Sequence, residues 1–208
     1  MNARCIICGE KALIERRFSN LRYCIKHAKE NMIISNIRRI RNKSNKIKQD
    51  ASYIIIGRYP IEYKVILNVI EKYLPRFNDM MEITKEFHSE NLYIETQKIV
   101  NEYSTISKLL ANTNINVILL KTADLIVHDI LYLVLNYKFN LIKSLISYER
   151  RLIMPFKNVF LTEVSKILGI RMEKNNYCTT YKFILTTINT RPTTIYGIIN
   201  YIENLSSI

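Results

Sequence analysis

Three of the four cysteines in this chain, together with one histidine, fall within the first 27 residues at a spacing typical of a metal site. Cys5 and Cys8 form a C-x2-C pair, and Cys24 and His27 form a C-x2-H pair after a gap of fifteen residues. Two such pairs supply the four donors that tetrahedral Zn²⁺ requires, and Gly9 stands where a knuckle turn often needs a positive φ. We therefore predict a closed, structural zinc site rather than three reduced thiols beside an unrelated histidine.

Length and composition favour one compact intracellular domain that carries this small knuckle. The chain has 208 residues and is 48% hydrophobic, which is enough to bury a core. It shows no apolar run as long as a membrane span and no pattern of a secretory signal. Cys178, the fourth cysteine, has no obvious disulfide partner. We expect a soluble, cytoplasmic protein.

The positive charge is concentrated near the start of the chain. The net charge is +13, and residues 1–50 contain thirteen Lys or Arg against four Asp or Glu, which gives +9. A solvated charged face would normally interleave acids, yet none occurs between Glu30 and Asp50. We therefore predict a polyanionic partner, RNA or DNA. The candidate nucleic-acid-binding residues are Arg16, Arg17, Arg22, Arg38, Arg39, Arg41, Lys43, Lys46 and Lys48.

Apolar periodicity predicts an α/β order of elements. Short β-branched runs predict buried strands at 53–57, 81–83, 116–120 and 152–156. Helical spacing predicts helices at 28–42, 61–73, 92–110, 125–145, 160–168, 179–188 and 194–205, with Gly169 as a C-terminal cap. We divide the chain into a zinc knuckle (1–30), a basic helix and linker (31–50) and an α/β domain with C-terminal helices (51–208).

This order of features resembles the PP-loop enzymes that install 2-thiouridine in tRNA, of the TtcA/TtuA type. The resemblance implies a parallel sheet of the adenine nucleotide alpha hydrolase-like kind behind an N-terminal zinc knuckle. The matching segments are Cys5–Gly9 and Tyr23–His27 for the knuckle, Ser52–Ile70 for the loop-bearing strand and its helix, Asn116–Asn136 for a strand, acidic loop and helix, Arg151–Ile170 for a proline-bearing strand end, and Cys178–Leu205 for the closing helices.

The phosphate-binding loop departs from the family pattern. The family uses Ser-Gly-Gly-Lys-Asp-Ser, whose small residues let backbone N–H groups reach ATP phosphates. Here the corresponding residues are Gly57, Arg58, Tyr59 and Pro60, with bulky side chains and one backbone donor removed by the proline. We therefore expect a degenerate nucleotide loop that does not bind ATP.

The cysteines that the family uses for sulfur transfer or an iron–sulfur cluster are missing as well. No cysteine lies between Cys24 and Cys178, and the helix that carries a C-x2-C pair in the family reads Glu95-Thr96-Gln97-Lys98 here. One thiolate cannot hold a cluster that needs three or four protein ligands. We expect no iron–sulfur cluster, and a Cys178 packed as a small hydrophobe, with a persulfide-carrying role as the alternative.

The acidic loop is the third departure. The family pattern is Gly-His-Asn-x-Asp-Asp-Glu, and this chain has Thr122-Ala123-Asp124-Leu125-Ile126-Val127-His128-Asp129. We expect Asp124 to be an N-cap, Asp129 to lie on the helix surface and His128 to be partly buried rather than catalytic.

Taken together, these departures predict a pseudoenzyme with no catalytic residues. The favoured function is a non-catalytic tRNA-binding subunit or partner of an active PP-loop thiolase, similar to the inactive subunit of the cytoplasmic tRNA 2-thiolation complex. The knuckle and the 38–48 stretch would contact phosphates, while apolar surface would pair with the catalytic subunit. Two alternatives remain: a zinc-knuckle DNA-binding transcription regulator, and an enzyme with a remodelled site.

Overall fold

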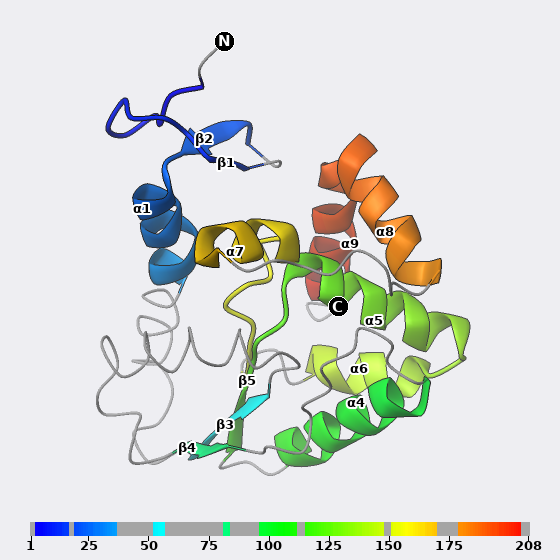
Figure 1. Ribbon diagram of the computed structural model, residues 1–208. Helices are drawn as coiled ribbons and strands as arrows, with labels where there is room; N and C mark the ends of the chain where they lie inside the picture. Colours follow the sequence, from blue (N-terminus) through cyan, green and yellow to red (C-terminus); the bar gives the residue numbers. More distant parts are fainter. Residues whose placement is uncertain are drawn as a thin grey trace.

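The structure is a computed structural model, and it shows a mixed α/β architecture with a cysteine-rich knuckle at the N-terminus (Figure 1). This confirms the predicted fold class. The structure describes residues 3–16, 19–36, 52–56, 81–83, 96–111, 115–147, 151–169 and 179–204. In this part of the chain no helix is both long enough and apolar enough to cross a membrane.

The N-terminal segment folds as a hairpin followed by a helical turn. Strands β1 (Ile14–Arg16) and β2 (Leu21–Tyr23) pair antiparallel, and Asn20 takes a φ of 52° in the turn between them. Asparagine tolerates this left-handed conformation better than most residues. Helix α1 (Ile25–Ala28) follows and continues into a π-helix, η1 (Lys29–Ile34). Of the helix predicted at 28–42, residues 28–36 are helical, and the remaining residues lie outside the described part.

A four-stranded parallel sheet forms the centre of the body. Its order is β4-β3-β5-β6, and every neighbouring pair is parallel. The strands are β3 (Ser52–Ile56), β4 (Met81–Ile83), β5 (Ile115–Leu119) and β6 (Leu152–Ile153). All four predicted strands are present, although β6 ends three residues earlier than 152–156 implies, because the chain turns at Pro155.

Among the described residues, six longer helices pack on the sheet or on one another (Figure 1). Helix α4 packs on β5 and α6, and the α8–α9 hairpin packs on α5. The predicted helix at 61–73 lies outside the described residues. The bounds are α4 (Thr96–Ala111), α5 (Ala123–Leu135), α6 (Phe139–Ser147), α7 (Leu161–Leu168), α8 (Thr179–Thr190) and α9 (Pro192–Asn204).

Strand β5 is buried on both faces, and its alternating side chains divide the core. Val117 and Leu119 pack in one cluster with residues of α4. Ile118 and the following Leu120 pack in another cluster with residues of η1 and α7. Because successive side chains of a strand point to opposite faces, one short strand holds α4 on one side and the knuckle on the other.

The helix predicted over 125–145 is two helices, because the chain turns between α5 and α6. Lys138 N–H donates to Leu133 O at 2.8 Å and Tyr137 N–H donates to Val134 O at 3.1 Å. This pair of bonds is the Schellman pattern that ends a helix. Tyr137 takes the left-handed position, with a φ of 56°. The apolar periodicity runs through this turn, so Asn136 is its only local sequence signal.

The same conformation ends α7 with the residue that it normally favours. Gly169 has a φ of 67°, and its N–H donates to Lys166 O at 3.3 Å. The predicted capping role of Gly169 is confirmed. The chain thus uses glycine at one left-handed helix end and a bulky tyrosine at another.

The two helix ends give a matched stability prediction. We expect Tyr137→Gly to raise the free energy of unfolding by about 1 kcal/mol and Gly169→Ala to lower it by about 1 kcal/mol, because a Cβ is unfavourable at positive φ. Urea denaturation followed by circular dichroism measures both changes. A Tyr137→Gly protein less stable than the parent would show that the tyrosine ring contributes packing within the chain.

Candidate metal centre and nucleic-acid interface

The four predicted ligands converge at the base of the knuckle. Their donor atoms all lie within 4.8 Å of one another. Cys5 and Cys8 stand on a turn that ends at Gly9, whose φ is 74°, while Cys24 immediately precedes α1 and His27 lies within it. A hairpin and one helical turn therefore bring the two sequence pairs together.

The spacing of these donors fits a tetrahedral ion. His27 Nδ1 lies 3.5 Å from Cys5 Sγ and 3.3 Å from Cys24 Sγ, and Cys8 Sγ lies 3.8 Å from Cys24 Sγ. Ligands at zinc's usual bond lengths, directed to the corners of a tetrahedron, stand roughly 3.5–3.8 Å apart. Three thiols and one imidazole thus form a group that could bind a metal ion and would leave no coordination position open.

The metal-free thiols differ in acidity. Burial raises the pKa of Cys5, but backbone N–H groups of Cys24, Cys8 and Ile7 donate to its sulfur and lower the pKa to about 6. The Glu10 N–H lowers the pKa of Cys8, whereas desolvation and the thiols of Cys5 and Cys24 raise it to about 11. Metal binding at neutral pH must therefore displace at least the Cys8 proton.

The metal centre shares a hydrophobic core with the body. Cys5 and Cys24 are buried in one cluster with Ile118 of β5. The same cluster includes the hairpin residues Ile14 and Tyr23 and residues of η1, β6 and α7. The knuckle is consequently continuous with the sheet, so a metal that orders the knuckle also supports one face of the body.

Two hydrogen bonds to one backbone oxygen, in the loop before α7, connect the hairpin to α9. Arg16 Nη2 donates to Asn158 O at 3.4 Å, and Tyr196 Oη of α9 donates to the same oxygen at 3.1 Å. Burial, followed by the charge of Glu163, raises the pKa of Tyr196, while Arg16 lowers it. The phenol therefore stays protonated and remains a donor. Arg16, predicted to contact nucleic acid, here also connects the knuckle to the C-terminal helices.

The other predicted nucleic-acid contacts are described only in part. Arg22 is exposed on β2 and pairs with the exposed Glu15 at 3.4 Å, a surface contact that contributes little. Arg17, Arg38, Arg39, Arg41, Lys43, Lys46 and Lys48 lie outside the described residues, as do Gly57, Arg58, Tyr59, Pro60 and Cys178.

A buried ionic cluster, which the sequence did not reveal, lies just after the carboxyl end of β5. The Lys121 ammonium is fully buried and pairs with Glu102 of α4 and with Asp129 Oδ2 of α5, the latter at 2.5 Å. Its Nζ also lies 4.6 Å from the centre of the Tyr103 ring. Removing three charges from water is costly, so the cluster is favourable only while all of its members are present. A lysine between an apolar strand and an apolar helix was the one available signal.

The acidic-loop predictions need correction. Asp129 is fully buried instead of exposed, and its Oδ1 lies 3.0 Å from Nδ1 of His128, which is buried as well. Asp124 caps α7 rather than its own helix, because its Oδ1 accepts the Leu161 N–H at 3.0 Å. The position before α5 is occupied by Thr122. These errors share one cause: periodicity locates an apolar face but not a polar partner that arrives from a distant segment.

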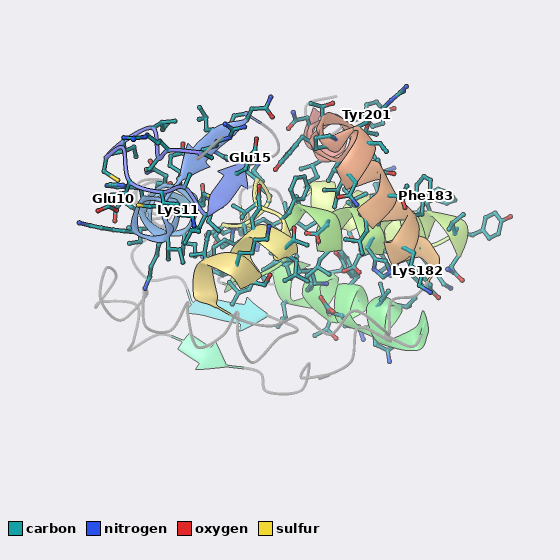
Figure 2. All side chains as sticks on the ribbon, turned by 45° about the horizontal axis from the view of Figure 1, so that its top comes forward. Glu10, Lys11, Glu15, Lys182, Phe183 and Tyr201 are labelled. Atoms are coloured by element: carbon teal, nitrogen blue, oxygen red, sulfur yellow. The ribbon has the colours of Figure 1, made fainter. Side chains whose placement is uncertain are left out.

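From residue 96 onward, the described acids are buried and most of the described cations are exposed. From residue 96 onward, the acidic side chains that the structure describes are all buried: Glu102, Asp124, Asp129 and Glu163. The exposed charges described in the same part are all positive: Lys108, Lys138, Lys143, Lys166, Lys182 and Arg191. Among the described residues, the exposed acids lie in the knuckle, where Glu10 and Glu15 accompany Lys11, while Lys182 projects from α8 (Figure 2). Such an exterior suits a polyanion.

Comparison with known proteins places this fold. No protein-family model matches the sequence, and no curated protein matches it. Among solved structures, the chain is similar to the U34-tRNA thiolase NcsA from Methanococcus maripaludis, solved with its [4Fe-4S] cluster. The TM-score is 0.62 at 11% identity, and the match covers 98% of this chain and 87% of the thiolase. The chain therefore has the fold of a PP-loop tRNA thiolase.

The prediction of a pseudoenzyme is wrong. The structure that shares this fold over nearly the whole chain is that of a thiolase. Of the three supposed losses, the first lies in the 57–60 loop, which is outside the described part, as is Cys178. The second, the missing C-x2-C pair at 95–98, is a difference in sequence that the structure does not test. In the third, Asp124 and Asp129 are not idle surface carboxylates but buried groups that organise the carboxyl end of β5.

The metal centre gives a prediction with an internal control. We expect one metal ion per chain in the parent protein and in Cys178→Ser, and its loss in Cys8→Ser, because of these two cysteines only Cys8 belongs to the tetrad. Metal analysis by mass spectrometry measures both the stoichiometry and the element. We also expect Cys8→Ser to lower the unfolding temperature of the whole chain, since the knuckle shares its core with the sheet. A separate low-temperature transition for the knuckle alone would contradict this.

The buried cluster predicts a large effect from one substitution. Replacing Lys121 by Met leaves the Glu102 and Asp129 carboxylates without their buried cation, and we expect the free energy of unfolding to fall by about 3–5 kcal/mol. Lys166→Met, at an exposed position on α7, should change it by less than about 0.5 kcal/mol. Urea titration of the two variants tests this, and equal effects would show that the cluster adds nothing to stability.

Proposed function

We propose that this chain binds tRNA and acts in tRNA 2-thiolation. The exterior of the body carries the proposal: every described acid from residue 96 onward is buried, and the exposed charges are cationic. Lys and Arg on such a surface replace counterions along a phosphate backbone, which supplies affinity without reading sequence. The thiolase fold supports tRNA as the polyanion.

The knuckle would supply a second set of phosphate contacts. Arg22 stands exposed on the hairpin, with Lys11 exposed at its edge. The basic stretch at 38–48, expected from the sequence to contact phosphates, directly follows η1 along the chain. These groups and the lysines of the body would orient a large, folded RNA rather than a short segment.

We propose zinc as the resident metal of the knuckle. Cys5, Cys8, Cys24 and His27 would hold it, and their spacing suits zinc's tetrahedral preference. A bound zinc ion would supply rigidity and no open position for substrate. The role of this chain's residues is then to keep the hairpin and α1 fixed over the sheet.

We further propose that the chain works in the cytoplasm together with a second PP-loop thiolase. The outer face of the α8–α9 hairpin supports a protein contact. It exposes Phe183 at 63% and Tyr201 at 64%, and most of its other exposed residues are Thr and Asn (Figure 2). Exposed aromatic side chains with few charges are typical of protein interfaces. Recovery of a thiolase with the tagged chain, lost in Phe183→Ala, tests this partner.

The fold does not favour the alternative of a DNA-binding transcription regulator. A parallel sheet flanked by helices matches a tRNA thiolase over nearly the whole chain, whereas a helical regulator has no need of such a sheet. Duplex DNA of the same length as tRNA is therefore the natural competitor in a binding assay. Preference for that DNA would overturn the proposal.

The Arg22–Glu15 pair gives a matched test of phosphate contact. Both Arg22→Gln and Glu15→Gln break the ion pair, but only Arg22→Gln removes a positive charge. We expect Arg22→Gln to weaken tRNA binding and to reduce the slope of log affinity against log salt by about one. Glu15→Gln should bind as tightly as the parent protein or more tightly. Fluorescence anisotropy with labelled tRNA measures both effects, and equal losses would assign Arg22 a purely structural role.

The pathway itself is tested in cells. We expect tRNA from cells that lack this chain to lose 2-thiouridine, measured by mass spectrometry of nucleosides, and to regain it when the gene is restored. If 2-thiouridine is unchanged while the chain binds tRNA tightly in vitro, the proposed role in 2-thiolation is wrong and the proposed tRNA binding stands.

A further inference from the structure

We propose that the turn between α5 and α6 is a stacking platform on which unpaired bases of RNA bind, with Tyr137 as its central ring. This inference rests on the proposed tRNA binding and assigns a surface of the body to it. The platform consists of Leu135, Tyr137, Lys138 and Phe139, with Lys143 one helical turn further along α6.

The side chains of this turn are unusually open for their kind. Tyr137 is 85% exposed, Leu135 66% and Phe139 53%. Three large apolar side chains therefore project from five consecutive residues. Single exposed apolar residues are ordinary, but a contiguous group of them marks a binding surface.

The backbone adds a second, independent observation. Tyr137 occupies the left-handed position of the Schellman turn, where glycine avoids the steric penalty of a Cβ. Its ring packs little against its own chain, because only a small part of it is covered. Strained residues that persist without such compensation are concentrated at functional sites. The conformation holds the ring outward, clear of both helices.

The charges around the rings favour nucleic acid as the occupant. Lys138 stands between Tyr137 and Phe139 in the chain and Lys143 follows on α6, and both lysines are exposed. The acids that the structure describes from residue 96 onward are all buried. Rings interleaved with cations suit a base and its phosphate, whereas lysine is depleted in the core of protein interfaces.

The first experiment uses a substitution that removes the ring and relaxes the backbone. We expect Tyr137→Gly to bind tRNA roughly 5- to 150-fold more weakly than the parent, the range typical for loss of one stacked base. Binding to a fully paired RNA duplex of similar length should be unchanged, as should the salt slope on tRNA. Tyr137→Phe keeps the ring and should bind like the parent. Because Tyr137→Gly is expected to be more stable, unfolding would not explain the loss.

The second experiment reads the contact directly. The chain contains fourteen tyrosines but no tryptophan, so Tyr137→Trp introduces a single indole, which can be excited selectively at wavelengths that tyrosine does not absorb. Stacking on a base should quench its emission as tRNA or a single-stranded oligonucleotide is added. Tyr201→Trp is the control: Tyr201 lies on α9, is 64% exposed against 85% for Tyr137, and stands two residues before an acid, so it should respond much less.

The outcomes separate this inference from the proposed function. If the parent binds tRNA with a steep salt dependence while Tyr137→Gly binds equally well and Tyr137→Trp is not quenched, the platform is wrong and tRNA binding stands. If the parent does not bind tRNA at all, both fail. Loss of a co-purifying protein in Tyr137→Gly, with RNA binding intact, would reassign the turn to a protein partner and overturn the proposal.

Discussion

Strand β5 is the element on which the rest of the structure depends. All five of its residues pair with β3, and Val117 and Ile118 also pair with β6. Its alternating side chains belong to two different clusters, one with α4 and one with the knuckle and α7. Lys121, directly beyond it, then draws α4 and α5 together through buried carboxylates. A strand buried on both faces cannot shift register without moving every neighbour, so it fixes the position of the knuckle as firmly as that of the helices.

Because of this packing, the candidate metal centre can stabilise more than the knuckle that contains it. A zinc knuckle read from sequence is a separate module of about thirty residues, stabilised by its ion. Here two of the ligands are buried in the same cluster as the sheet, and Arg16 joins the hairpin to the loop before α7. Metal binding contributes to the free energy of folding wherever the site is absent in the unfolded chain. It would therefore stabilise the body as well as the knuckle. The boundary proposed at residue 30 separates the candidate metal ligands from the rest of the chain, while one hydrophobic cluster contains residues from both sides of it.

Sequence reasoning succeeded where the signal is local and failed where it is not. The metal tetrad, the four strands and the Gly169 cap each follow from spacing or periodicity within a few residues, and each is present. The turn at Tyr137 was missed because the apolar pattern continues through it without a glycine. The burial of Asp129 was missed because its cationic partner, Lys121, lies in the loop after β5, and no pattern within α5 reveals a cation that arrives from outside.

The distribution of charge follows from the same packing. Each buried acid has a structural role, since Asp124 and Glu163 accept N–H groups at the start of α7, while Glu102 and Asp129 pair with Lys121. Among the described residues from 96 onward, the acids are therefore withdrawn from the surface and the exposed charges are positive, without any dense basic run. A count of charges along the sequence pointed to residues 1–50, because it cannot tell a buried carboxylate from an exposed one. In the described residues from 96 onward, exposed cations therefore add to the basic residues counted in the N-terminal quarter.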